Sequence, residues 1–180
     1  MNESVGQGER DAASRGIVIG PGEGRTIPGT DAIPLIATGE QTGGSIGVFE
    51  DTTSPGDGPP RHVHYGSDEL FYVLEGEFLL LVGERQESVS TGTYVFGPRG
   101  TVHTYKVIGT EWGRLLSAFI PGGPERAFEE FVKLRTEGEE VNRSARRSRS
   151  VAQMNKMFAQ INEKYDSEFV GPPCRALRTS

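Results

Sequence analysis

The sequence contains a single cysteine, Cys174, among its 180 residues. One cysteine cannot form an intramolecular disulfide, so the chain lacks the cross-links that stabilise many secreted domains. No stretch reaches the roughly 20 consecutive apolar residues of a membrane span. The N-terminal region also shows no basic start followed by an apolar core of signal-peptide length. We therefore expect a cytoplasmic protein without a membrane partner.

Positive charge is also scarce, because 19 basic residues stand against 25 acidic ones and the formal net charge is −6. The only arginine-rich segment lies among serines between positions 143 and 149, a composition typical of a solvated linker. Nucleic-acid-binding domains usually carry a net positive charge and a basic face. We therefore expect no nucleic-acid partner.

Glycine and proline are abundant, with 25 and 11 residues. They separate short runs of apolar and aromatic residues at intervals of about eight to twelve residues, which is typical of a β-sandwich or barrel. The pattern predicts one all-β domain over residues 16–120. The expected strands are Ile17–Ile19, Ile33–Ala37, Ser45–Glu50, Arg61–Tyr65, Glu69–Glu75, Glu77–Val82, Thr93–Phe96, Thr101–Val107 and Gly113–Ile120.

The two ends of the chain differ from this central region. Residues 1–15 are polar and without periodicity, which predicts a flexible tail. After residue 120 the apolar residues recur at helical spacing, and Pro124 suits the first turn of a helix. A second helix is expected over 150–165. We expect residues 121–180 to form a helical extension that packs on the barrel or on the partner subunit of a homodimer.

The three histidines of the chain lie between positions 62 and 103. His62 and His64 are one residue apart in an expected strand, so their side chains point to the same face. Glu69 begins the next apolar run, where a buried carboxylate needs a compensating charge. His103 lies on a later strand. Imidazole and carboxylate together suit first-row transition metals, so we predict that these four residues bind one metal ion.

The spacing of these residues resembles the two consensus blocks of the cupin superfamily. The first block, G-x5-H-x-H-x4-E-x6-G, is matched by Gly56, His62, His64, Glu69 and Gly76. The second block, G-x5-P-x-G-x2-H-x3-N, is matched by Gly92, Pro98, Gly100 and His103, with Val107 in place of the final asparagine. That last position is not a metal ligand, so the ligand set is complete.

This resemblance implies a double-stranded β-helix, or jelly-roll barrel, with a C-terminal helical appendage. It also implies one divalent transition metal in the barrel interior, drawn from Fe(II), Mn(II), Ni(II), Co(II) and Zn(II). The parity of the ligands along their strands predicts that Phe71, Val73 and Tyr105 face inward and line the space for a small organic substrate.

The layout further resembles single-domain, quercetinase-like cupins, in a Pro-Gly-Gly-x-Glu turn before a Phe-rich helix and in a late Tyr-Asp-Ser-Glu-Phe-Val-Gly-Pro-Pro segment. This resemblance implies a dioxygenase that uses O2 on an enolic or phenolic, flavonol-like substrate, with Glu69 as the catalytic base. Two alternatives stay open. One is an isomerase or cyclase that uses the same site without O2, and the other is a non-enzymatic small-molecule- or metal-binding cupin.

Overall fold

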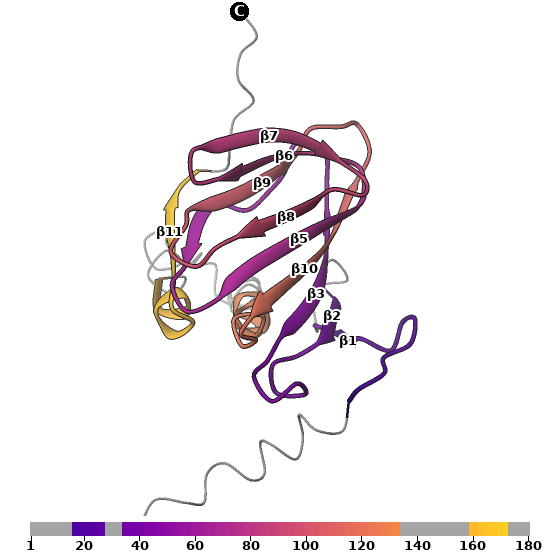
Figure 1. The fold of residues 1–180 in the computed structure, drawn as a ribbon, viewed down its shortest axis with the longest axis vertical. Coiled ribbons are helices and arrows are strands. Elements are labelled where there is room, and N and C mark those ends of the chain that lie inside the picture. The colour runs from indigo at the N-terminus through magenta and orange to yellow at the C-terminus, as the bar shows by residue number, and fades with distance from the viewer. Residues whose placement is uncertain (1–15, 28–33, 134–158, 173–180) are drawn as a thin grey trace, which may run out of the picture.

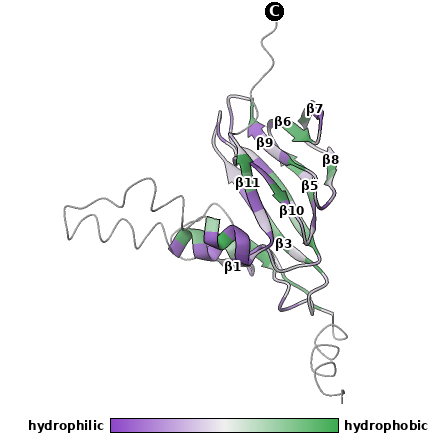
Figure 2. Ribbon diagram, turned by 90° about the vertical axis from the view of Figure 1, so that its left-hand side faces the viewer, coloured by the Kyte–Doolittle hydropathy of each residue, from purple (hydrophilic) through white to green (hydrophobic). Residues whose placement is uncertain are grey.

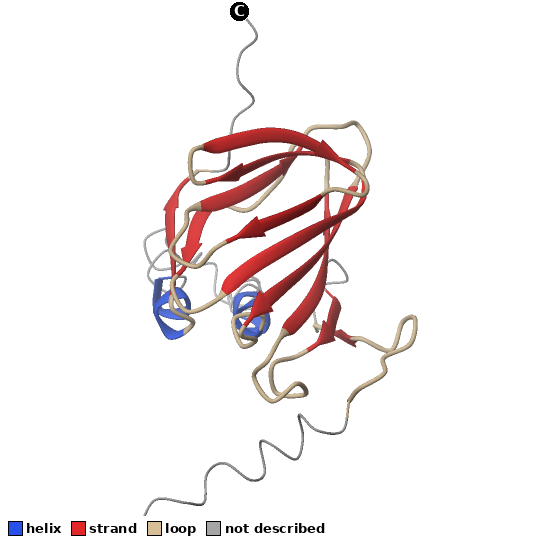
Figure 3. Ribbon diagram, viewed as in Figure 1, coloured by secondary structure: helices blue, strands red, loops and turns tan. Residues whose placement is uncertain are grey.

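The structure, a computed structural model, describes residues 16–27, 34–133 and 159–172, which form β-strands and parts of two helices (Figures 1 and 3). The helical residues are 126–133 and 159–164. The strands are β1 (Arg25–Thr26), β2 (Pro34–Ala37), β3 (Gly47–Thr53), β4 (Arg61–His64), β5 (Asp68–Glu75), β6 (Glu77–Val82), β7 (Arg85–Ser90), β8 (Tyr94–Gly97), β9 (His103–Val107), β10 (Gly113–Ile120) and β11 (Ser167–Gly171). No described helix has the length and apolar character that a membrane crossing requires.

The strands form two antiparallel sheets that face each other. One sheet has the order β1-β2-β3-β10-β5-β8, and the other has the order β11-β4-β9-β6-β7. The chain therefore passes between the sheets several times, for example from β3 to β4 and from β9 to β10. Figure 1 shows the resulting barrel, with the two helices at its lower end. The expectation of an all-β, two-sheet jelly roll with short helices near the C-terminus is confirmed.

The inner faces of the two sheets provide the hydrophobic core. Alternating buried and exposed residues along β5 and β10 place every second side chain inside the barrel. The larger cluster consists of Phe71, Val73, Phe78, Leu80, Tyr105, Val107 and Leu115. A second cluster lies at the end of the barrel near helix 126–133 and consists of Ile27, Leu35, Phe49 and Phe119, with Phe128 and Val132 packed against it. In Figure 2, hydrophilic and hydrophobic residues alternate along the helices.

Gly76 forms the corner at which the chain leaves the first sheet for the second. Its φ of 90° lies in the left-handed region, where a side chain is strained. A Cβ atom at this position would also lie 2.9 Å from the Cα atom of Gly113. The sharp turn expected between Glu69–Glu75 and Glu77–Val82 therefore requires glycine, and it connects the strand that carries Glu69 to the opposite sheet.

The C-terminal part adds a strand to the barrel that the sequence pattern did not predict. β11 pairs antiparallel with β4, with Phe169 opposite His62. Helical residues 159–164 fall within the helix expected over 150–165, whose earlier part lies outside the described residues, as does the tail expected at 1–15. The strand that carries His62 and His64 therefore has a hydrogen-bonded neighbour on each side, β11 and β9.

One predicted strand is absent from the structure, and one further strand was not predicted. The segment Ile17–Ile19 is not a strand, and Val18 is 97% exposed. Three apolar residues make a strand only where a neighbouring strand accepts their hydrogen bonds, and β2 instead pairs with Arg25–Thr26. Conversely, β7 was missed because its sequence, Arg-Gln-Glu-Ser-Val-Ser, contains a single apolar residue. Such a composition is normal for an edge strand that exposes most of its side chains.

Candidate metal centre

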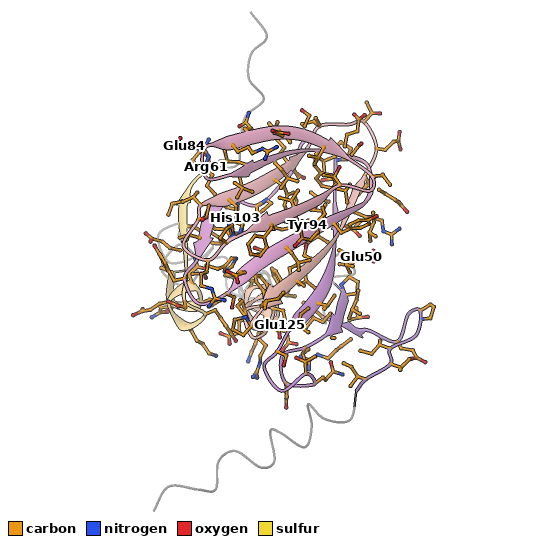
Figure 4. All side chains as sticks on the ribbon, viewed as in Figure 1. Glu50, Arg61, Glu84, Tyr94, His103 and Glu125 are labelled. Atoms are coloured by element: carbon orange, nitrogen blue, oxygen red, sulfur yellow. The ribbon has the colours of Figure 1, made fainter. Side chains whose placement is uncertain are left out.

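Both sheets contribute to the cluster of histidines and glutamate. His62 and His64 lie on β4, and His103 is the first residue of β9. The register pairs His62 directly with His103. Glu69 is the second residue of β5 in the opposite sheet and is only 4% exposed. The two sheets thus bring together the four residues that the sequence predicted as metal ligands. In Figure 4, His103 lies in the middle of the barrel.

The three imidazoles converge on a single carboxylate oxygen. The Oε2 atom of Glu69 lies 2.8 Å from Nε2 of His103, 3.2 Å from Nε2 of His64 and 3.7 Å from Nε2 of His62. One ligand atom from each of the four residues lies within 4.8 Å of all the others. This arrangement places four donor atoms of the kind that first-row transition metals prefer around one point.

Backbone carbonyls orient two of the rings. The Nδ1 atom of His62 lies 2.8 Å from the carbonyl oxygen of Pro60, and Nδ1 of His103 lies 2.8 Å from the carbonyl oxygen of Thr101. A hydrogen bond from Nδ1–H to a carbonyl fixes the tautomer and turns Nε2 toward the centre. These contacts therefore prepare both rings to bind a cation through Nε2.

The loop before His103 is attached to the strands that carry the other three residues. Arg99 donates to Asp68, the residue before Glu69, through its backbone N–H at 2.9 Å and through Nε at 3.0 Å. Gly100 donates its backbone N–H to the carbonyl oxygen of His64 at 2.7 Å. The Pro98-Arg99-Gly100 turn thus fixes where β9 begins, and with it the position of His103.

The electrostatics of the cluster favour an ionised carboxylate. Burial by itself raises the pKa of Glu69, but the hydrogen bond with His103 and the close approach of His62 and His64 hold this pKa well below its usual range. Burial lowers the pKa of His62. Burial by itself also lowers the pKa of His103. The hydrogen bond with Glu69 outweighs burial, so the pKa of His103 is raised.

His64 shows that the four residues fit a metal ion. Its side chain is buried, and although Nε2 lies 3.2 Å from Oε2 of Glu69, neither ring nitrogen makes a hydrogen bond to the described residues. A buried imidazole without partners is unfavourable unless something else satisfies its nitrogens. A cation at the point where the three Nε2 atoms meet would satisfy His64 and neutralise Glu69 together.

A cavity of about 320 Å³ opens beside this cluster. Its lining includes His62 and Glu69 of the cluster and Phe128 of helix 126–133. The lining residues are Asp51, Thr52, Thr53, Asp57, Gly58, Pro59, His62, Glu69, Phe71, Tyr105 and Phe128. Of the three residues that the sequence predicted as substrate-lining, Phe71 and Tyr105 line this cavity. The third, Val73, is completely buried in the larger core cluster.

Asp51 is the cavity residue that sequence reasoning missed. It lies on β3 and is 9% exposed, and its side chain faces the barrel interior. Burial raises the pKa of Asp51 to about 7, and the charge of Glu69 adds to this effect. The expected strand, Ser45–Glu50, ended one residue before Asp51. Its extension would have been the available signal, because Asp51 then shares a face with the core residue Phe49.

A larger cavity of about 600 Å³ lies against helix 159–164 and β11. It is lined by Tyr65, Ala159, Asn162, Glu163, Asp166, Ser167, Glu168 and Phe169 and contains none of the four clustered residues. The smaller cavity is the one adjacent to groups that can bind a metal, so it is the candidate site.

Comparisons with known proteins agree with this geometry. Residues 49–119 match the family described as Cupin domain. The chain is 28% identical over 117 residues to quercetin 2,3-dioxygenase from Bacillus subtilis (strain 168), a match that covers 64% of this chain and 33% of that protein. The chain thus spans about a third of the length of this curated relative.

Two bacterial proteins are among the solved structures that are similar to part of this chain. An RmlC-like cupin from Shewanella frigidimarina is 18% identical, with a TM-score of 0.49, and the match covers 59% of this chain and 93% of the other. A predicted oxalate decarboxylase from Thermotoga maritima is 20% identical, with a TM-score of 0.48, and the match covers 49% of this chain and 78% of the other. These similarities are too distant to bear on the chemistry.

Proposed function

Since residues 49–119 are a cupin domain, we propose that this protein is a metal-dependent dioxygenase that acts with O2 on a small enolic or phenolic, flavonol-like substrate. The observation that carries the proposal is the convergence of three histidine Nε2 atoms on the Oε2 atom of Glu69 beside a cavity lined by Phe71 and Tyr105. The distant similarity to quercetin 2,3-dioxygenase supports the choice of substrate class.

His62, His64, Glu69 and His103 would hold the metal. When bound there, a divalent ion of Fe, Mn, Ni, Co or Zn supplies Lewis acidity, which lowers the pKa of a substrate hydroxyl group and favours its anion. The pairing of β4 with β9 directs the Nε2 atoms of the three histidines toward the Oε2 atom of Glu69, where the metal would lie. The ion itself is chosen by availability as well as by the donor set, so several metals are to be tested.

Glu69 is the residue placed to accept the proton of the substrate hydroxyl group. It faces the cavity, and its contacts with the histidines keep it ionised and therefore able to accept a proton. Phe71 and Phe128 offer aromatic surface to a flat substrate.

The first test is elemental analysis of the purified protein, followed by oxygen consumption with flavonols and other enolisable aromatics under each candidate metal. Oxygen uptake that is proportional to substrate loss, and that His103→Ala abolishes, supports the dioxygenase. A bound metal with no oxygen uptake for any of these substrates contradicts it. Absence of bound metal under every condition favours a non-enzymatic small-molecule-binding cupin.

Asp51 favours one second candidate, an isomerase or cyclase that uses the same site without O2. Such a reaction moves a proton between two substrate positions and needs both a proton donor and a proton acceptor. Asp51 and Glu69 line the same cavity, and the pKa of Asp51 is raised to about 7 while that of Glu69 is low. Two carboxyl groups whose pKa values differ in this way are suited to opposite roles. Substrate conversion under strictly anaerobic conditions distinguishes this candidate from the dioxygenase.

We also propose that the protein is a homodimer. The outer surface of β5 and β8 carries Tyr72 and Tyr94, which are opposite each other in the register and are 41% and 59% exposed. β8 is also an edge strand, which leaves backbone groups available for a second copy. Light scattering at micromolar concentration is expected to give twice the chain mass, and the mass of a single chain would contradict the proposal.

A further inference from the structure

The register of the first sheet places Asp51 and Glu69 at different levels of the barrel interior. In this sheet β10 lies between β3 and β5, and Leu115 is opposite both Asp51 and Val73, whereas Phe119 is opposite Glu69. Asp51 on β3 and Glu69 on β5 therefore point into the same barrel interior, and one strand, β10, lies between β3 and β5. Neighbouring strands lie about 4.8 Å apart, so the two positions are separated by roughly 10 Å across the sheet alone.

Asp51 belongs to a small polar network within this apolar interior. Against the effect of burial, the neighbouring Tyr105 hydroxyl group lowers the pKa of Asp51, and the oxygen of this hydroxyl group lies 3.4 Å from Oγ1 of Thr53. Ser117, which is completely buried, places its Oγ atom 3.5 Å from Oδ2 of Asp51. Tyr105 and Ser117 thus lie beside the Asp51 carboxyl group, and Thr53 lies beside Tyr105.

This network leaves Asp51 with unused capacity to accept hydrogen bonds. A carboxylate offers about four lone-pair sites, and two hydroxyl donors, one of them at 3.5 Å, occupy at most half of them. Among the described residues no lysine, arginine or histidine forms an ion pair with Asp51. An asparagine or threonine at this position could bond Tyr105 without the cost of burying an ionisable group. The geometry therefore indicates that the carboxyl group has a further partner on the cavity side.

We propose that Asp51 determines substrate specificity by accepting a hydrogen bond from a second hydroxyl group of the substrate, while the first hydroxyl group lies at His62 and Glu69. Tyr105 and Ser117 position the Asp51 carboxyl group for this contact. The inference rests on the proposed function and narrows its substrate class to multi-ring phenolic or enolic compounds with hydroxyl groups at opposite ends.

The test measures binding without turnover. The protein is loaded with Zn(II), which has no redox chemistry, and titrated with 3-hydroxyflavone and with derivatives that each carry one added hydroxyl group at a different ring position. At least one derivative is expected to bind about tenfold more tightly than the parent, the gain typical of a hydrogen bond to a charged group. Asp51→Ala is expected to abolish this preference and to leave the affinity for the parent within about threefold. Asp51→Asn, which retains a carbonyl acceptor, is expected to restore part of it.

Glu50→Ala serves as the matched control, because Glu50 is the neighbour of Asp51 on β3 but faces outward and pairs with Arg114. It is expected to bind all ligands as the unmodified protein does. The inference is overturned if Asp51→Ala still prefers the hydroxylated derivative to 3-hydroxyflavone, or if the unmodified protein binds all derivatives equally. The proposed function stands in both cases, because the flavonols still bind. If no flavonol binds the Zn(II)-loaded protein at all, both are overturned.

Discussion

Both ring nitrogens of His103 face oxygen atoms, and one of these belongs to Glu69. Nε2 lies 2.8 Å from Oε2 of Glu69, and Nδ1 lies 2.8 Å from the carbonyl oxygen of Thr101. Only the protonated imidazolium can donate to both. This relationship explains why the pKa of His103 is raised even though burial acts against the charged form. A metal ion and the proton on Nε2 therefore compete for the same atom.

Metal binding is expected to release about one proton near neutral pH. Because the pKa of His103 is raised above 6.5 in the metal-stripped protein, Nε2 is substantially protonated at pH 6.5, and it must lose this proton to bind an ion. The apparent affinity for Zn(II) should accordingly fall as the pH is lowered. Calorimetry in buffers of different ionisation enthalpy measures the proton count. A count near zero at pH 6.5 would show that His103 is neutral before the metal binds.

Removal of a ligand is expected to remove the metal but not the fold. His62→Ala, His103→Ala and Glu69→Gln should each weaken metal binding by more than about 100-fold, which exceeds the usual effect of losing an outer-shell partner. Glu77→Gln, a carboxyl replacement at an exposed position on β6, is the control and should bind one ion. Circular dichroism checks the fold, and elemental analysis counts the metal. Stoichiometric metal in both histidine variants would refute the assignment of the centre.

Replacement of Asp51 should stabilise the metal-stripped protein at high pH. The folded-state pKa of about 7 lies above the ordinary value of 3.8, so the folded protein holds the proton more tightly than the unfolded chain does. Stability then falls as the pH rises from about 4 to 7, by up to about 4 kcal/mol. Asp51→Asn removes this loss of stability. The unfolding free energy of the variant, measured in urea, should therefore exceed that of the unmodified protein by almost nothing at pH 4 and by the largest amount at pH 8. A constant difference across this range would contradict the shift.

A buried carboxylate outside the centre holds helix 126–133 against the barrel. Glu125 is fully buried, and it accepts the backbone N–H of Gly39 at 2.7 Å and that of Gly123 at 2.6 Å (Figure 4). Glu125→Ala leaves both donors unsatisfied and should cost about 3 kcal/mol of unfolding free energy. Gly47→Ala should have a similar effect, because its Cβ atom would overlap the Glu125 carboxylate.

Chemical denaturation measures these two variants, and Glu40→Ala, an exposed position in the same region, is the control. The flavonol affinity provides a second readout, because the helix begins next to Glu125 and carries Phe128, which lines the cavity. If Glu125→Ala unfolds at the same denaturant concentration as the control, Glu125 does not anchor the helix.

The sequence predicted the ligands because their spacing depends on local geometry. Two histidines that are separated by one residue in a strand lie on the same face, whichever strand pairs with them. Glu69 was expected to face the same barrel interior, because a buried carboxylate needs a compensating charge. The distances of 2.8 Å to 3.7 Å between them arise from the pairing of β4 with β9 and from the facing of the two sheets. The spacing within one segment carries no information on that pairing.

The parts that the sequence did not predict depend on long-range contacts. β11 is a short, half-exposed segment whose partner, β4, lies about a hundred positions earlier in the chain. Asp51 is an ordinary acidic residue until the register of β3, β10 and β5 places it on the same inner, apolar face as Glu69. In each case the residue type is compatible with a surface loop, and only tertiary packing decides otherwise.

The pairing of β11 with β4 means that the recognisable domain and the functional unit have different boundaries. The family match ends at residue 119, yet the strand that carries His62 and His64 borders Ser167–Gly171 on one side. In a fragment that ends at residue 119, β4 would become an edge strand. The strand that carries His62 and His64 would then keep β9 as a hydrogen-bonded neighbour and lose β11. Engineering that transplants this centre therefore has to carry the distant C-terminal strand along with the barrel.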